Sequence, residues 1–187
     1  MSNKIDARAA KTYAIIFKSL DELLQDKNFS ELSVLDITNH AKIHRTTFYK
    51  RFKDKNDALE AYIQNCFKCL NNQVFDLNHY RTPQEYYLSL LGGFFDVIYE
   101  NKSLYNSLIL KDEKNYDIVI VLMHLLRQMI NDKIKEVENF GIIHRTSSEL
   151  LAAVYSGALV SLIIFWKEHK NVSKQELYTT LNRIILK

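Results

Sequence analysis

Residues 33–52 read SVLDITNHAKIHRTTFYKRF, and this stretch indicates two short helices joined by a tight turn. Its apolar side chains share two helical faces, Val34, Ile37 and Ala41 on the first helix, and Phe48 and Phe52 on the second. Ser33 and Asp36 have the spacing of a capping box, in which a hydroxyl and an acid satisfy free backbone N–H groups. The first helix is therefore expected to begin near Val34.

Positive charge gathers around the second of these helices. Residues 42–55 contain six basic side chains and one acid, a net charge of +5, whereas the whole chain of 187 residues carries only +3. The six are Lys42, Arg45, Lys50, Arg51, Lys53 and Lys55. A cluster of this kind is typical of a nucleic-acid-binding surface, and the alternative is a merely solvated basic face.

The outward-facing side chains of the second helix are hydrogen-bond donors without one matching acid. They are Arg45, Thr46, Thr47, Tyr49 and Lys50. Such a surface suits a phosphate-lined groove that a short helix enters with its N-terminus first. Arg45 and Thr46 lie at that N-terminus, where side chains reach base edges, and Arg has the shape to bind guanine O6 and N7 together.

The longer stretch ITNHAKIHRTTFYKRFKDKNDAL, residues 37–59, resembles the helix-turn-helix of the TetR family of bacterial repressors. The matching positions are Ile37, Ala41, Ile43, Thr47, Phe48, Tyr49, Phe52, Lys55 and Leu59. The stretch departs from the family at Thr38, Lys42 and His44, which are usually Ala, Gly and Ser. A residue other than Gly that needs a positive φ in the turn is strained by about 1 kcal/mol or more.

The resemblance implies an all-α protein of about nine helices. Residues 1–54 would form the helix-turn-helix DNA-binding domain, with a linking helix at about 55–75, and residues 76–187 a regulatory and dimerisation domain. Thr47, Tyr49 and Lys55 match positions at which the family contacts the DNA backbone, and Lys50 could contact either backbone or bases. The full expected DNA-binding set is Lys42, His44, Arg45, Thr46, Thr47, Tyr49, Lys50 and Lys55.

Apolar periodicity and capping signals divide the remaining chain into helices. Residues 2–11 read as a polar arm that either touches phosphates or frays, followed by a helix from Tyr13 to about Asp26. Later helices are expected at about 83–98, 103–110, 115–138, 147–169 and 174–186. Three signals for helix starts are Thr82-Pro83-Gln84-Glu85, Thr146-x-x-Glu149 and Ser173-x-x-Glu176, and Gly141 is expected to close the helix before it.

The run from Leu150 to Trp166 contains no charged residue, which reaches the lower length limit of a membrane span. A buried helix explains it better, because Ala153, Gly157 and Ser161 recur every four residues and allow another helix to approach closely. The resemblance implies that the last two helices pair with those of a second copy. The expected dimer interface comprises Leu150, Ala153, Val154, Gly157, Ser161, Leu177, Leu181 and Ile184.

Many aromatic and soft side chains in the second half of the chain could line an apolar effector pocket. They are Tyr87, Phe94, Phe95, Tyr99, Tyr116, Met123, His124, Phe165 and Trp166. The alternative is ordinary core. The segment SGALVSLIIFWKEHKNVSKQEL, residues 156–177, resembles a TetR subgroup that includes an activator of dihydroxyacetone kinase genes, in which a partner protein can replace a small-molecule effector.

Cys66 and Cys69 do not make a disulfide framework, and no apolar segment follows the first Met, so a cytoplasmic protein is expected. No second cysteine pair completes a zinc site, and we expect neither metal nor cofactor. The chain lacks a Gly-rich phosphate loop, a nucleophile elbow and an HExxH segment, so we expect no enzyme.

These observations predict a sequence-specific DNA-binding transcriptional regulator, a homodimeric repressor of a palindromic operator. A small-molecule or protein effector would release it, and no membrane would be involved. The alternative is a helical interaction or enzyme module whose basic patch is incidental.

Overall fold

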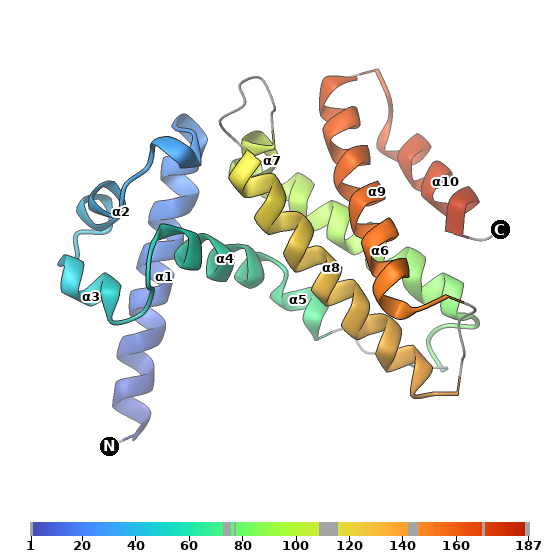
Figure 1. The fold of residues 1–187 in the computed structure, drawn as a ribbon, viewed down its shortest axis with the longest axis horizontal. Helices are drawn as coiled ribbons and strands as arrows, with labels where there is room; N and C mark the ends of the chain where they lie inside the picture. Colours follow the sequence, from blue (N-terminus) through green and yellow to red (C-terminus); the bar gives the residue numbers. More distant parts are fainter. Residues whose placement is uncertain are drawn as a thin grey trace. The chain divides into compact units, whose positions relative to one another are not determined.

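A computed structural model describes residues 2–72, 76, 78–108, 116–141, 146–169 and 171–185. These residues form ten α-helices and one short 3-10 helix, and no strand occurs among them (Figure 1). The chain divides into two compact units. Unit 1 is Met1–Asn65 with Asn101–Ile118, and unit 2 is Cys66–Glu100 with Val119–Lys187. The all-α prediction is confirmed.

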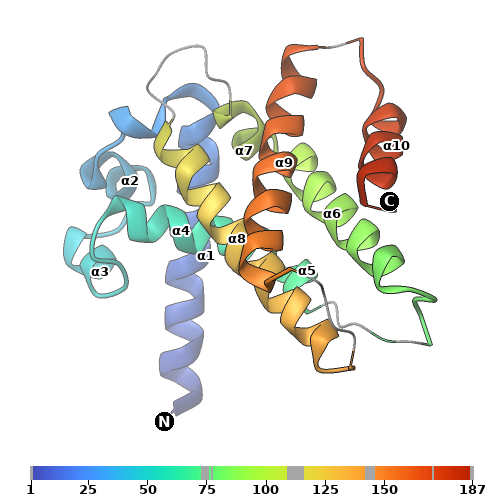
Figure 2. The same cartoon turned by 45° about the vertical axis from the view of Figure 1, so that its right-hand side comes forward.

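Unit 1 is built on a long first helix. Its elements are α1 (Ser2–Asp26), η1 (Phe29–Glu31), α2 (Val34–His40), α3 (Arg45–Tyr49), α4 (Lys55–Cys66, of which the last residue belongs to unit 2) and α7 (Lys102–Ser107). α2 lies beside α1, and α3 lies beside α2 (Figures 1 and 2). The fully buried side chains of the unit are Ile16, Leu20, Phe29, Ile37, Phe48, Ala58, Leu59, Ile63, Leu104, Leu108 and Ile118.

The polar arm expected at residues 2–11 is instead the beginning of α1. Neither Gly nor Pro interrupts this segment, and its Ala, Arg and Lys residues are good helix formers. Arg8 and Lys11 are exposed on this part of the helix. The polar arm is therefore a wrong prediction: a polar segment without Gly or Pro can continue a helix as well as an apolar one.

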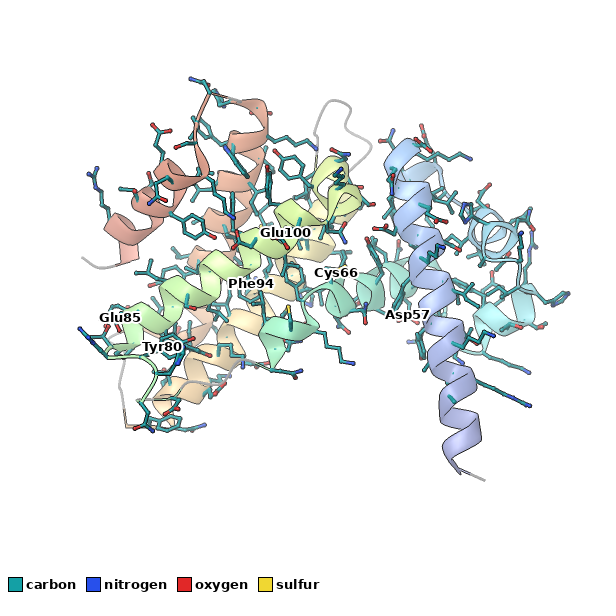
Figure 3. The ribbon with its side chains drawn as sticks, turned by 180° about the vertical axis from the view of Figure 1, so that it is seen from behind. Asp57, Cys66, Tyr80, Glu85, Phe94 and Glu100 are labelled. Atoms are coloured by element: carbon teal, nitrogen blue, oxygen red, sulfur yellow. The ribbon has the colours of Figure 1, made fainter. Side chains whose placement is uncertain are left out.

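The single helix expected at 55–75 is interrupted at Phe67, where α4 ends and α5 (Lys68–Asn71) begins. Phe67 has φ −91° and ψ 6°, and its buried ring lies 5.5 Å from that of Phe94. Figure 3 labels Cys66 at the end of α4 and Phe94 on α6 (Pro83–Glu100). Burial of Phe67 against α6 is the physical reason for the break; residues 73–75 lie outside the described part.

Unit 2 gathers its other helices around α6. They are α5, α8 (Tyr116–Glu138, of which the first three residues belong to unit 1), α9 (Ser148–Glu168) and α10 (Lys174–Ile185), and α6 lies beside both α9 and α10 (Figure 2). A Cβ atom on Gly92 would lie 2.7 Å from Tyr178 Cε1, and one on Gly93 would lie 2.6 Å from Leu70 Cδ2. Two adjacent glycines therefore let α10 and α5 approach α6 closely.

Capping signals located the helix ends of unit 2 well. Thr82 Oγ1 accepts a hydrogen bond from the Glu85 N–H at 3.2 Å, and Ser173 Oγ accepts one from Glu176 at 3.2 Å. Gly141 ends α8 with φ +84°, as expected. The start of α9 differs by one residue, because its N-cap is Ser147, which accepts from the Leu150 N–H at 3.3 Å, and not Thr146.

α9 combines an apolar composition with an incompletely covered surface. By length and composition it is the one helix among the described residues that could cross a membrane, and 33% of its most apolar 18-residue window is buried within the chain. Leu150 and Val154 are 57% and 58% exposed, and a Cβ on Gly157 would meet no atom within 4 Å. Among the residues that the structure describes, none therefore covers the apolar face of α9 around Leu150 and Val154 completely.

Candidate nucleic-acid interface

The capping box predicted at the start of α2 is present. The Asp36 carboxylate accepts the Ser33 N–H at 2.9 Å, and Ser33 Oγ accepts the Asp36 N–H at 3.2 Å. The Ser33 hydroxyl also donates to the Asp36 carboxylate. Hydrogen bonds from the Ser33 side chain and then its backbone hold the pKa of Asp36 below its usual value of 3.8. This box fixes where the helix-turn-helix begins.

The turn between α2 and α3 has the left-handed residue that the sequence comparison anticipated. Lys42 has φ +53°, a conformation that costs a residue other than Gly about 1 kcal/mol. Its N–H donates to Asn39 O at 3.1 Å, and the Ile43 N–H donates to Thr38 O at 3.0 Å. Lys42 therefore makes the turn that Gly usually makes, and its side chain is exposed.

α3 is held from behind by aromatic packing. Phe48 is fully buried, and its ring lies 5.4 Å from that of Phe52. The Phe52 ring in turn meets Tyr13 of α1 edge-on at 5.3 Å. A helix of five residues is too short to be stable alone, so this packing is what keeps α3 helical.

The opposite face of α3 presents the predicted donors together. His44, Arg45, Thr46, Tyr49 and Lys50 are exposed, Tyr49 to 56%. The remaining predicted residue of this helix, Thr47, is half-buried. This face has the chemistry to bind phosphates and base edges, because it offers cations and hydroxyls without a carboxylate.

His44 has a structural role that the sequence did not predict. It is the N-cap of α3, and its Nδ1 accepts the Thr46 N–H at 3.3 Å and lies 2.9 Å from Thr46 Oγ1. The family's usual Ser at this position would cap the helix with a hydroxyl, so the imidazole replaces that function. Part of His44 is therefore engaged inside the protein.

Lys55 begins α4, as predicted, but its ammonium has hydrogen-bond partners within the chain. Its Nζ donates to the carbonyl oxygens of Phe29, Ser30 and Leu32 at 3.0, 3.1 and 2.8 Å. An ammonium has three donors, and all three are used within the chain. Backbone carbonyls therefore compensate the cation at the start of α4, so this compensation does not require the DNA phosphate that the sequence suggested.

Sequence reasoning also missed how α7 joins unit 1. Asn101 Nδ2 donates to the Tyr62 hydroxyl at 3.1 Å, and that hydroxyl donates to Asp21 Oδ1 at 2.7 Å. Ser103 Oγ donates to Asp21 O at 2.8 Å. The prediction counted this segment with the regulatory domain, because no local pattern reveals contacts between residues so far apart in sequence.

The residues expected to line an effector pocket differ in burial. Those that are buried, Tyr87, Phe94 and Phe95, belong to the core, whereas those that are exposed, Tyr99, Met123, His124 and Phe165, reach solvent. Trp166 packs between Phe95 and Tyr99, with ring centroids 4.9 and 4.7 Å away. The Tyr116 side chain lies outside the described residues. Core packing is thus the better interpretation for much of this set.

The residues expected at a dimer interface also include both exposed and buried side chains. Leu150, Val154 and Ser161 are exposed, and Ala153 and Gly157 are half-buried beside them. Leu177 is only 4% exposed and belongs to the core of its own unit, which corrects its assignment. The side chains of Leu181 and Ile184 lie outside the described residues.

The two cysteines remain thiols: Cys66 is half-buried at the end of α4 (Figure 3), and Cys69 is exposed on α5. Within the part of the chain that the structure describes, no three His, Cys, Asp or Glu side chains are placed to hold a metal ion.

Models of two protein families match the chain. The family described as bacterial regulatory proteins, tetR family, matches residues 16–62, which include α2, α3 and most of α4. The family described as transcriptional regulator C-terminal region matches residues 91–187, more than half of the chain.

Individual relatives agree with these matches. The HTH-type dhaKLM operon transcriptional activator DhaS of Lactococcus lactis subsp. lactis is 32% identical over 127 residues, 67% of this chain and 64% of that relative. The matched stretch therefore spans less than two thirds of the relative's own length.

Two solved structures share the fold. A TetR-family regulator from Syntrophomonas wolfei has TM-score 0.67 and 15% identity, with 94% of this chain and 93% of that chain covered. The regulator FadR of Bacillus subtilis, solved with stearoyl-CoA, has TM-score 0.56 and 15% identity, with 92% and 97% covered. With helix-turn-helix geometry, family matches and fold in agreement, this chain belongs to the tetR family of bacterial regulatory proteins.

Proposed function

We propose that this regulator recognises a palindromic operator in double-stranded DNA as a homodimer, with α3 as the helix that reads the sequence. The outer face of α3 carries the proposal, because it presents Arg45, Thr46, Tyr49 and Lys50 to solvent and keeps Phe48 inside. In this division of labour, unit 1 binds DNA, and unit 2 supplies regulation and dimerisation.

The contacts on α3 fall into two classes. Arg45 and Thr46, at the N-terminal end, read base edges in the major groove. Thr47, Tyr49 and Lys50 hold the helix on the sugar-phosphate backbone, together with Lys42 in the exposed turn. The net charge of +5 over residues 42–55 supports this assignment, although Lys55 contributes only to the field and not to a contact.

The second copy covers the exposed face of α9. Leu150 and Val154 are large apolar side chains with more than half of their surface in water, and a Cβ atom on Gly157 would meet no described atom within 4 Å. An apolar face of this kind is buried most simply by the same face of a twofold-related copy. The two copies of α3 would then lie about 34 Å apart, or a multiple of that, on one side of the DNA.

The regulator acts in the cytoplasm as a repressor that an apolar small molecule or a partner protein releases. The relative from Lactococcus lactis is described as an activator, so activation of the target genes is the second candidate. A reporter gene behind the selected operator decides between them, because a repressor lowers expression and an activator raises it.

Selection of bound duplexes from a random pool tests the proposal. We expect a palindromic consensus, and a gel shift with that duplex that survives excess random competitor. Recovery of sequences without a consensus, or a shift that random DNA removes equally well, would identify the basic patch as incidental.

A further inference from the structure

We propose that Lys55 is a positioning residue for DNA recognition, which fastens the segment before α2 to the start of α4 and does not contact a phosphate. The inference rests on the proposed DNA-binding function and concerns how the protein prepares α3 for it.

The three carbonyl oxygens around Lys55 Nζ belong to one short piece of chain. Phe29, Ser30 and Leu32 provide them, at 3.0, 3.1 and 2.8 Å. Phe29 and Ser30 lie in η1, and Leu32 is its C-cap residue, so the ammonium lies at the negative end of this small helix. The ring of Phe29, 4.7 Å from Nζ, adds a cation–π contact.

The Lys55 contact joins two helices of the DNA-binding unit, α2 on the carbonyl side and α4 on the ammonium side. Leu32 is followed directly by Ser33, the N-cap of α2, and Phe29 and Leu32 are both buried. Lys55 is the first residue of α4. The ammonium therefore fixes the beginning of the helix-turn-helix relative to α4, which follows its end.

The start of α4 is a firm point of attachment. Asp54 Oδ1 accepts the N–H groups of Asn56 and Asp57 at 2.8 and 2.9 Å, and Asp57 Oδ2 accepts the Lys53 N–H at 2.9 Å. Figure 3 labels Asp57 in this first turn. These reciprocal caps hold the backbone that carries Lys55.

The geometry explains why the residue is Lys. Three oxygens that converge on one point match an ammonium, whereas the flat guanidinium of Arg spreads its donors over a fork. A cation in the first turn of a helix also opposes the helix dipole, so the residue needs the acceptors that η1 provides. Loss of hydrogen bonds to a charged group is costly, because it leaves the carbonyl oxygens without their partner.

One readout needs no DNA. Amide hydrogen exchange of the full-length protein, followed by mass spectrometry, should be faster at residues 29–36 in Lys55→Met than in the wild type. Exchange in α9 should be unchanged. Lys53→Met, which removes an exposed charge two residues away, is the matched control and should leave residues 29–36 as protected as before. Unchanged exchange in Lys55→Met would overturn the inference, even if no operator were found.

The second readout separates positioning from phosphate contact. Affinities of the wild type, Lys55→Met and Lys55→Arg for the selected operator and a scrambled duplex are measured over a range of salt, well below the unfolding temperature of each variant. We expect both variants to lose about 10- to 100-fold at the operator, equivalent to about 1.4–2.7 kcal/mol, with little change on scrambled DNA. The dependence of log K on log salt concentration should stay the same.

A phosphate contact would give the opposite pattern. Lys55→Met would weaken both duplexes equally and flatten the salt dependence by about 0.9 per protomer, and Lys55→Arg would retain binding. That result overturns the inference, as does unchanged affinity of a folded Lys55→Met. Should Lys55→Met fail to fold, Lys55→Arg alone distinguishes the two roles. This substitution keeps the charge, so it lowers operator affinity only if Lys55 acts through its contacts with the three carbonyl oxygens. Failure of the wild type to prefer the operator would instead reject the proposed function.

Discussion

α3 and α9 each present a face that is exposed within the described part of the chain, and the two faces have opposite chemistry. α3 has five residues, with cations and hydroxyls outside and Phe48 inside. α9 has 21 residues and exposes Leu150 and Val154. Exposed hydrogen-bond donors are well solvated by water and remain free to bind an anion. Exposed apolar surface is unfavourable in water until another apolar surface covers it. Exposure alone therefore does not identify a partner; the chemistry of the exposed atoms does.

The largest effect is expected inside α3. Phe48→Ala should lower the free energy of unfolding by about 3–5 kcal/mol, because it removes a fully buried ring that packs against Phe52. Tyr49→Ala, at the next position, is the control and should change stability by less than about 0.5 kcal/mol, because its ring is exposed. Urea denaturation measures both, and similar losses would mean that the two faces of α3 are assigned wrongly.

The next effect concerns α9. Changing Leu150 and Val154 together to Asp should weaken self-association by about 3 kcal/mol or more, because each interface would bury carboxylates without partners. Sedimentation velocity at micromolar concentration should show dimers of the wild type and of Arg45→Ala, but monomers of the double variant. A wild type that sediments as a monomer would contradict the claim that a second copy covers the apolar face of α9.

A smaller loss is expected for one contact of α3. Arg45→Ala should cost about 1–3 kcal/mol at the operator and relax the preference at one base pair in each half-site. Lys53→Ala, an exposed cation outside α3, should leave base preference unchanged. Binding to a panel of single-base variants of the operator measures this. A uniform loss on all sequences would show that Arg45 contacts the backbone.

The smallest effect is expected at the capping box of α2, the helix that lies beside α3. Ser33→Ala should cost about 1 kcal/mol, the usual value for loss of an N-cap hydroxyl. Because the Asp36 pKa is lowered on folding, the stabilisation by its charge is complete above its usual value of 3.8 and disappears as pH falls through the lower folded pKa. The stability difference between the wild type and Asp36→Asn should therefore shrink below pH 3.8. A difference that stays constant there contradicts this role of Asp36.

Local signals in the sequence predicted much of the fold. Ser33, Thr82 and Ser173 cap helices where the residue types indicated, and Lys42 takes the positive φ expected of the Gly position that it fills. The outer face of α3 was also predictable, because its donors follow helical spacing around the buried Phe48. These features depend on residues within one or two helical turns.

The failures depend on distant residues. The break after α4 arises because Phe67 packs on Phe94, and Lys55 binds carbonyls that precede it by more than 20 positions. Periodicity shows which face of a helix is apolar, but not which neighbour covers it. For the same reason aromatic residues such as Phe95 and Trp166, which pack on each other, resembled a pocket lining.

The most direct test of the account is a titration of the selected palindrome, its isolated half-site and a scrambled duplex with the full-length protein, with the stoichiometry determined by native mass spectrometry. We expect two protomers on the palindrome, and an affinity at least about 10³ times that for scrambled DNA. The isolated half-site should bind far more weakly than the palindrome, because only one copy of α3 can engage it. Equal affinity for all three duplexes, or one protomer on the palindrome, would contradict the claim that a dimer reads DNA with two copies of α3.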